Sequence, residues 1–213
     1  MIDYIRAFCY NSTPKEAIYM QIDIDSRIVI ITGPSTTGKS TLANKILESS
    51  PVKAVVISHD AIADEINDKQ SERQRSEELY IRLVNKVFAA LKNSENKLII
   101  FDVPGINANY IYSLLQIIEM ANHYHDNITL IKINLPIETH LKLMKLRMQT
   151  DPGVIFYFND FDEYLQTILS QRSNYEGPWG SLYTKYPHCN DCIIDNSENV
   201  SLNFNFPKSY ERK

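Results

Sequence analysis

Cysteine is scarce in this sequence, with three in 213 residues: Cys9, Cys189 and Cys192. An odd count in a chain of this length does not make a disulfide framework, so we expect a reducing compartment and a cytoplasmic location. Cys189 and Cys192 have Cys-x-x-Cys spacing, which occurs in zinc and redox sites. A zinc site needs a second pair of ligands, however, and His188 alone does not supply one. The alternative is two small residues at the start of a strand.

Excess positive charge and long hydrophobic runs are also absent. The formal net charge is -4, which provides no overall field to attract a long nucleic acid, although it is compatible with a local basic patch. No run is long and apolar enough to span a membrane. The opening stretch MIDYIRAFCYNSTPKEA carries charge early and lacks a continuous apolar core, so we expect no signal peptide.

Hydrophobic residues are nevertheless plentiful, at 44% of the chain, which is enough to bury the core of one domain. Five apolar runs bounded by turn residues predict buried parallel strands. These runs are Arg27–Thr32, Lys53–Ile57, Lys97–Val103, Asn127–Asn134 and Asp191–Asp195. The helical patterns between them are Lys39–Ser49, Ser71–Asn93, Asn107–His123 and Pro136–Met148. The alternation predicts an α/β domain over residues 27–197, with a five-stranded, mostly parallel sheet and helices on both faces.

Three segments lie outside this alternation. We expect residues 1–26 to pack on the core, as a helix or strand that closes one edge of the sheet. Residues 149–190 are longer than a simple crossover and contain nine aromatic residues. They are either a helical subdomain with its own apolar contacts or a mobile lid over the site, because long insertions at the carboxyl end of a sheet are often functional. Residues 198–213 are expected to be a C-terminal tail.

Glycine is rare as well, with six in the chain, yet two of the six fall in the segment GPSTTGKST after the first apolar run. This segment matches G-x-x-x-x-G-K-[ST], the P-loop that binds nucleotide phosphates. Its glycines allow backbone N–H groups to turn toward an anion, and the following helix presents its N-terminus to the phosphates. The predicted nucleotide-binding residues are Gly33, Pro34, Ser35, Thr36, Thr37, Gly38, Lys39, Ser40 and Thr41.

A phosphate and metal site can be assembled around this loop. Lys39 is expected to reach the β- and γ-phosphates, and the hydroxyl of Ser40 to bind Mg²⁺. P-loop proteins complete the metal site with a carboxylate from the end of a neighbouring strand, and Asp102 follows the apolar run LIIF. The sequence therefore predicts ATP and Mg²⁺ as cofactors, with Ser40 and Asp102 as the metal-binding residues.

A second acidic residue follows the second apolar run, which ends in VVISHD at Asp60. The carboxyl edge of an α/β sheet is where ligands bind, and a carboxylate there can accept the proton of an attacking hydroxyl. The alternative is that Asp60 only caps a helix over Ala61–Asn67. The neighbouring His59 is more typical of a loop histidine than of a catalytic group.

These segments together resemble the P-loop kinases that phosphorylate small hydroxyl compounds or nucleic-acid ends. That group includes chloramphenicol phosphotransferase, the kinase domain of polynucleotide kinases and the zeta-toxin-like proteins. The similar segments are IVIITGPSTTGKSTLANKIL, VVISHDAIADEI, LIIFDVPG, LIKINLPIETHLKLMKLRMQ and CIIDNSE. The resemblance implies a P-loop NTPase fold with a helical lid, and it covers roughly residues 27–197.

The resemblance also implies roles for individual residues. Asp60 matches the general base, and Arg147 matches the arginine that opens the lid and touches the transferring phosphoryl group. The lid departs from the family pattern, because DPGVIFYFNDFDEY follows where a second arginine of an RxxxR pattern is expected. Arg172 is the next arginine and is a candidate for that second role. Without the resemblance, Arg147 is equally a solvated cation favoured at a helix C-terminus.

The sequence therefore predicts a kinase that moves the γ-phosphate of ATP to a hydroxyl of a small or nucleotide-like acceptor. A protein acceptor and adenylyl transfer stay open. The alternative is a GTP- or ATP-binding switch or binding module without an acceptor. Asp102-Val-Pro-Gly105 fits the DxxG of GTPases, but no Asn-Lys pair in the chain continues into the NKxD that reads guanine. The helix expected before the Asp102 strand also disagrees with the hairpin of GTPases.

Overall fold

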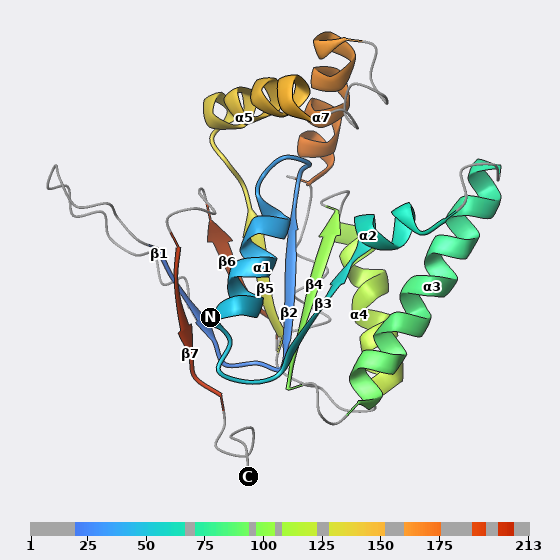
Figure 1. Ribbon diagram of the computed structural model, residues 1–213, viewed down its shortest axis with the longest axis vertical. Coiled ribbons are helices and arrows are strands. Elements are labelled where there is room, and N and C mark those ends of the chain that lie inside the picture. Colours follow the sequence, from blue (N-terminus) through green and yellow to red (C-terminus); the bar gives the residue numbers. More distant parts are fainter. Residues whose placement is uncertain are drawn as a thin grey trace, which may run out of the picture.

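A five-stranded parallel sheet forms the centre of the protein (Figure 1). The computed structural model describes residues 20–66, 71–93, 97–104, 108–122, 128–151, 160–175, 189–194 and 200–206. The strands are β2 (Ile28–Gly33), β3 (Ala54–Ser58), β4 (Leu98–Pro104), β5 (Ile128–Ile133) and β6 (Cys189–Ile194). Their order is β3-β4-β2-β5-β6, and every pairing within this sheet is parallel. The predicted α/β sheet is confirmed.

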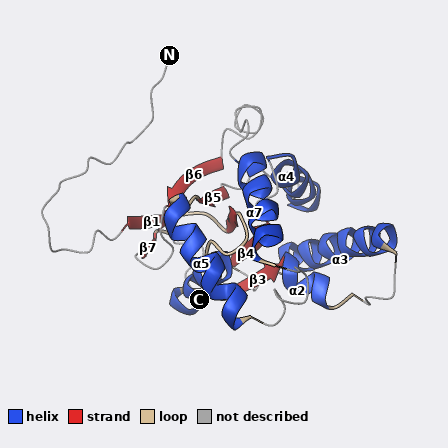
Figure 2. Ribbon diagram, turned by 90° about the horizontal axis from the view of Figure 1, so that it is seen from above, coloured by secondary structure: helices blue, strands red, loops and turns tan. Residues whose placement is uncertain are grey.

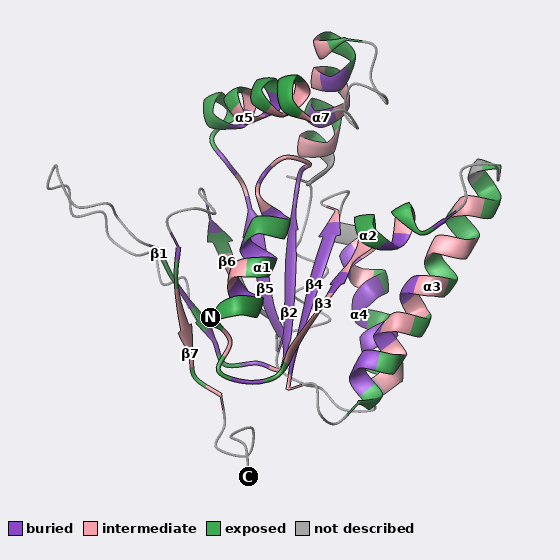
Figure 3. Ribbon diagram, viewed as in Figure 1, coloured by how far each residue is buried: buried purple, intermediate pink, exposed green. Residues whose placement is uncertain are grey.

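Continuous burial explains why the central strands are apolar at every position. All six residues of β2 and of β5 are buried, and in β4 only the last residue is partly exposed. Alternate side chains of β2 serve opposite faces: Ile28 and Ile30 join one core cluster, and Val29 and Ile31 join the other. Figure 3 shows these strands as buried, with exposed residues on the outer sides of the helices.

Helices cover both faces of the sheet, as predicted. The helices are α1 (Lys39–Ser49), α2 (His59–Asp64), α3 (Glu72–Lys92), α4 (Ala108–Asn122), α5 (Ile137–Thr150) and α7 (Phe161–Tyr175). Residues of α2, α3 and α4 pack on one face, while α1 packs on the other. Helix α3 begins at a capping box, in which Ser71 and Gln74 satisfy each other's backbone N–H groups. None of the helices in the described ranges is long and apolar enough to cross a membrane.

The connection from β3 to β4 runs through α2 and α3, and the two strands are parallel. A GTPase hairpin would require these strands to be antiparallel neighbours. Helix α3 is the helix that was expected before the Asp102 strand. Because β3 and β4 are parallel, this part of the fold disagrees with the GTPase alternative.

A second, two-stranded parallel sheet joins the two ends of the chain. Strand β1 (Met20–Ile24) pairs with β7 (Val200–Phe204). Ile22, Ile24 and Val200 are buried in the core cluster on the α1 face. The expectation that residues 1–26 close an edge of the main sheet is therefore wrong for residues 20–24. The C-terminal tail expected over residues 198–213 contains β7. No local sequence signal predicts the pairing of β7 with the distant β1.

Two helices lie beyond the carboxyl ends of the main strands. In Figures 1 and 2, α5 and α7 are placed over this edge of the sheet. They pack on each other through a small core of Met144, Tyr164 and Ile168. Helix α5 corresponds to the helix predicted over Pro136–Met148, and α7 shows that part of the segment 149–190 is helical. That this segment acts as a lid stays a prediction, and residues 152–159 and 176–188 lie outside the described residues.

The buried position of β1 can be tested by an alanine substitution. Ile24 is 0% exposed and Ile193 on β6 is 57% exposed. We expect Ile24→Ala to lower the free energy of unfolding by about 2–4 kcal/mol, because it leaves a cavity in the core. The matched substitution Ile193→Ala should cost less than about 0.5 kcal/mol. Urea denaturation measures both, and equal losses would contradict the packing of β1 on the core.

Candidate active site

The loop between β2 and α1 lies tightly against the end of β5. A side chain at Gly33 would place its Cβ 2.7 Å from the carbonyl oxygen of Ile133 and 2.9 Å from Thr37 Oγ1. Such distances exclude any residue larger than glycine unless the backbone shifts. Gly38, just before α1, has a φ of 85°, in the left-handed region that glycine adopts without strain. Steric constraints therefore explain why both of these motif positions are glycine.

Thr36 at the tip of the loop also has a positive φ, of 64°. This conformation is unusual for a β-branched residue. Strain of this kind costs on the order of 1–3 kcal/mol and is concentrated at ligand-binding sites. The backbone of the loop is thus held in a conformation that local preference does not favour.

Lys39 lies inside the loop rather than in solvent. Its side chain is buried, and Nζ donates a hydrogen bond to the carbonyl of Pro34 at 3.0 Å. Thr37 Oγ1 donates to the same carbonyl at 2.9 Å. Burial lowers the pKa of Lys39, and the charges of Asp102 and Asp60 oppose that shift. The carbonyl of Pro34 is thus the hydrogen-bond acceptor that a phosphate oxygen would have to replace at the Lys39 ammonium group.

Ser40 and Asp102 meet directly, although they are far apart in the sequence. Ser40 Oγ donates to Asp102 Oδ2 at 2.7 Å. The sheet order causes this contact, because Asp102 of β4 is in register with Ile31 of β2, just before the loop. Burial raises the pKa of Asp102, against the hydrogen bond from Ser40 and the charge of Lys39.

A hydroxyl and a carboxylate are suitable ligands for Mg²⁺, which prefers oxygen and keeps several waters or phosphate oxygens in its shell. The described residues contain no group of three or more His, Cys, Asp or Glu side chains that could hold a metal by themselves. The role of Ser40 and Asp102 as metal-binding residues stays a prediction, and their oxygens are of the type that Mg²⁺ prefers.

Asp60 does not cap a helix over 61–67, as the alternative required. Helix α2 begins at His59, and its N-cap is Ser58, whose hydroxyl accepts from the N–H of Ala61. The Asp60 side chain is 81% exposed. The hydrogen bond from His59 holds the pKa of Asp60 below its usual value, and the charge of Lys39 adds to this shift against burial. An exposed, ionised carboxylate thus stands beside the loop.

His59 contacts both Asp60 and Tyr110, and the sequence predicted no role in the site for His59 or Tyr110. His59 Nδ1 lies 3.4 Å from Asp60 Oδ1. The rings of His59 and Tyr110 are 5.7 Å apart and nearly perpendicular. Burial raises the pKa of the Tyr110 phenol, and the charge of Asp60 adds to the effect. The position of His59 next to Asp60 in the sequence could have indicated that it lies at the site. Tyr110 belongs to α4, and nothing in the sequence indicated that it lies near Asp60.

The two lid arginines occupy different places. Arg147 Nη1 lies 3.4 Å from Ser35 Oγ, and its Nε pairs with Asp151 at 3.0 Å. The charge of Arg147 is felt at both Lys39 and Asp60. Arg172 instead donates from Nη1 to the carbonyl of Leu135 at 2.7 Å, at the connection between β5 and α5. The structure thus brings Arg147 to the loop and Arg172 to the base of the lid.

Other lid residues that were not predicted also contact the loop tip. Tyr164 OH and Thr36 Oγ1 share a hydrogen bond of 3.1 Å. Gln171 Oε1 accepts from the backbone N–H of Ser35 at 3.3 Å, and His140 Nε2 lies 2.7 Å from the Ser35 carbonyl. No pattern in the sequence indicated these contacts, because they join residues more than one hundred positions apart.

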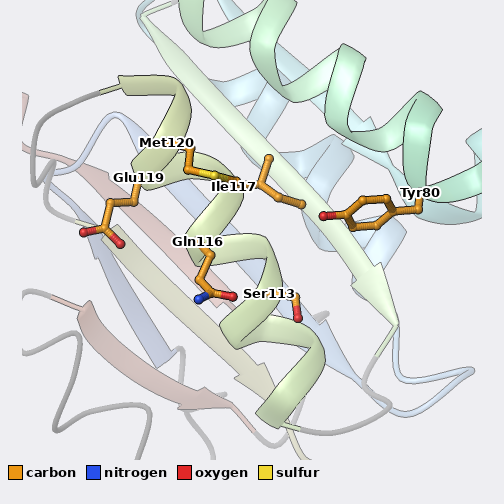
Figure 4. Close-up of a pocket in the computed structure, with 6 residues that line it drawn as sticks. All are labelled: Tyr80, Ser113, Gln116, Ile117, Glu119 and Met120. Carbon is orange, nitrogen blue, oxygen red and sulfur yellow. The ribbon is translucent and has the colours of Figure 1, made fainter.

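A pocket of about 270 Å³ lies elsewhere, between α3 and α4 (Figure 4). Its lining residues are Tyr80, Ser113, Gln116, Ile117, Glu119 and Met120. In Figure 4, Tyr80 extends from α3 toward Ile117 on α4. None of the predicted site residues lines this pocket, so it is separate from the phosphate loop.

The Cys-x-x-Cys pair lies within strand β6, which favours the interpretation of two small residues at the start of a strand. His188 and Cys9 lie outside the described residues.

Several solved structures are similar to this chain. A chain from the Pnkp1/Rnl/Hen1 RNA repair complex superposes with a TM-score of 0.53 at 17% identity, covering 78% of this chain and 48% of that one. A gluconokinase from Sinorhizobium meliloti 1021 has a TM-score of 0.47 at 14% identity, with 80% and 84% covered. A shikimate kinase from Bacteroides thetaiotaomicron has 0.48 at 14% identity, with 84% and 87% covered. No curated protein matches the sequence.

The chain spans less than half the length of the RNA repair chains, at 40% and 48%. At such identities the likeness concerns the fold alone. The sequence itself matches a family model described as an AAA domain over residues 28–177. This match covers well over half of the chain, which therefore belongs to the AAA domain family, and its fold is similar to that of the RNA repair chain.

Proposed function

We propose that this protein is an ATP- and Mg²⁺-dependent kinase that transfers the γ-phosphate to a hydroxyl of a small or nucleotide-like acceptor. The observation that carries the proposal is the convergence of two carboxylates on Lys39. Asp102 comes from β4 and Asp60 from the first turn of α2, directly after β3. Both carboxylates act electrostatically on the lysine inside the loop, and Asp102 accepts a hydrogen bond from the adjacent Ser40 at 2.7 Å. A metal ligand, a phosphate-binding cation and a proton acceptor at one sheet edge are the parts that phosphoryl transfer needs.

The loop supplies the phosphate contacts in this proposal. Lys39 exchanges the carbonyl of Pro34 for phosphate oxygens, and its ammonium group neutralises their charge. Ser40 Oγ and Asp102 Oδ2, which lie 2.7 Å apart, would hold Mg²⁺ when it binds. The bound Mg²⁺–nucleotide supplies the phosphoryl group and spreads its negative charge.

Asp60 orients the acceptor and takes its proton. Its carboxylate is exposed at the edge of the site, and the hydrogen bond from His59 lowers its pKa, so it is ionised at neutral pH. Asp60 does not cap α2, so capping does not account for an aspartate here.

The lid closes over the site and excludes water, which would otherwise accept the phosphoryl group. Arg147 is proposed to touch the transferring group, because it already reaches the loop at Ser35. Arg172 is proposed for the second lid role, which requires it to exchange the carbonyl of Leu135 for a phosphate oxygen.

Transfer itself is tested with ATP labelled on the γ-phosphate. Purified protein, Mg²⁺ and labelled ATP are incubated with separate small-metabolite, nucleic-acid and protein extracts. We expect label in one fraction, and a loss of about 100-fold or more for Lys39→Ala, because the lysine stabilises the charge of the transferring group. Lys92→Ala, on the exposed end of α3, is the matched control. ATP binding that depends on Lys39, without transfer to any fraction, would identify a binding module instead.

The role of Asp60 predicts a specific defect in turnover. Asp60→Asn should lower kcat by about 10²–10⁴-fold, as expected for a general base. The affinity for nucleotide should persist, because Asp60 does not belong to the loop. Asp64→Asn, a matched change at an exposed position of the same helix, should leave kcat intact. Steady-state kinetics on the identified acceptor measures kcat for each variant. A wild-type kcat in Asp60→Asn would show that Asp60 is not the general base.

The buried Asp102 predicts opposite effects on stability and on metal binding. Its folded-state pKa is raised above the usual 3.8, so its contribution to stability is present at low pH and is lost as pH rises through the folded pKa. At neutral pH the wild type therefore holds an unfavourable carboxylate that Asp102→Asn removes.

We expect Asp102→Asn without ligand to melt at the same temperature as the wild type or higher, and to lose most of the stabilisation by Mg²⁺ with ATP. Thermal unfolding at pH 7 with and without Mg²⁺–ATP measures both effects, and Asp64→Asn is again the control. A wild-type response to Mg²⁺–ATP in Asp102→Asn would exclude Asp102 as a metal ligand.

A further inference from the structure

His140 lies on the inner face of α5, one turn before Met144. The two residues are 0% and 1% exposed. The backbone N–H of His140 donates to the carbonyl of Pro136 at 3.0 Å, which places the residue in the first turn of the helix. Its side chain reaches away from α5 to the loop, where Nε2 lies 2.7 Å from the carbonyl oxygen of Ser35.

The contact determines which ring nitrogen carries the proton in the neutral ring. A carbonyl only accepts, so Nε2 carries the proton and Nδ1 is left as an acceptor. Nδ1 is buried and has no hydrogen-bond partner among the residues that the structure describes. Burial lowers the pKa of His140 against the hydrogen bond to Ser35, and the charges of Arg172 and Lys39 add to the lowering. The ring is therefore neutral at neutral pH.

Packing alone does not account for a histidine at this position. A buried acceptor without a partner costs free energy. Leucine or methionine would fill the same space beside Met144 without that cost. What His140 provides, and an apolar side chain cannot, is a hydrogen bond to Ser35.

That hydrogen bond acts on one of two peptide groups that face opposite ways at the loop tip. In the first, the N–H of Ser35 donates to Gln171 on α7, while the carbonyl of Pro34 accepts from Lys39. In the second, the Ser35 carbonyl accepts from His140 on α5. The lid helices thus hold the N–H of one peptide and the C=O of the next.

The consequence concerns the N–H of Thr36. This N–H belongs to the same peptide group as the Ser35 carbonyl, and none of the described peptide bonds is cis. In a planar trans peptide the C=O and N–H point in opposite directions. When His140 holds the carbonyl toward α5, the Thr36 N–H points away from α5, into the loop. The positive φ of Thr36 completes this arrangement.

We propose that His140 is a positioning residue for nucleotide binding: by holding the Ser35 carbonyl, it directs the Thr36 N–H toward the phosphates. The inference rests on the nucleotide binding of the proposed function and does not require phosphoryl transfer. His140 touches no phosphate itself. It keeps in place a peptide group whose conformation at Thr36 is locally unfavourable.

Binding of ATP and of inorganic tripolyphosphate, each with Mg²⁺, tests this role by calorimetric titration. We expect His140→Leu to raise the Kd of both ligands about five- to tenfold, since one neutral hydrogen bond contributes on this scale. His140→Gln, whose amide can donate to Ser35, should stay within about twofold of the wild type. The ¹H–¹⁵N signal of Thr36 should move on ligand addition in the wild type and His140→Gln, and much less in His140→Leu.

Leu115→Ala is the control for a merely structural effect. It opens a cavity in a core cluster that contains no described residue of the loop, α5 or α7, so its Kd should stay within about twofold when measured below its melting temperature. Wild-type affinity in His140→Leu, or an equal loss in Leu115→Ala, would overturn the inference. If the wild type bound neither ligand, both this inference and the proposed function would fail. Binding without transfer would overturn only the proposed function.

Discussion

The central place of β2 in the sheet is the constraint on which the rest of the site depends. With β4 on one side and β5 on the other, the loop after β2 meets the ends of both neighbours. One neighbour brings Asp102 to Ser40. The other comes so close that Gly33 has no room for a side chain. A parallel sheet places all carboxyl ends at one edge, so the order of the strands decides which side chains meet there.

The lid is tied to the same loop from the opposite side. Helices α5 and α7 pack together through their own small core, and together they hold all the polar groups of Ser35: its N–H, its carbonyl and its hydroxyl. The two helices therefore contact two adjacent peptide groups at the loop tip. Under the proposed function, this arrangement would couple phosphate binding to the position of α5 and α7, since both act on these peptide groups.

Several features of the site lower stability rather than raise it. Burial lowers the pKa of Lys39 and raises the pKa of Asp102, so it disfavours the charged form of each. Thr36 has a positive φ. His140 has a buried ring nitrogen without a hydrogen-bond partner in the described part of the chain. These residues lie within one loop and its immediate neighbours. The surrounding apolar sheet, with β2 and β5 buried throughout, stabilises the fold enough to tolerate them.

The sequence by itself determined the main sheet, the flanking helices and the phosphate loop, because these depend on local periodicity and on a motif with a short span. The spacing of Gly33, Gly38 and Lys39 is a local property, and so is the capping box at Ser71. Only the tertiary structure decided the pairing of β1 with β7, the cap at Ser58 in place of Asp60, and the contacts of Tyr110, His140 and Gln171 with the site. The physical reason is that these features join residues distant in the chain, or depend on a shift of two residues in the position where a helix begins. Neither leaves a periodic signal in the sequence.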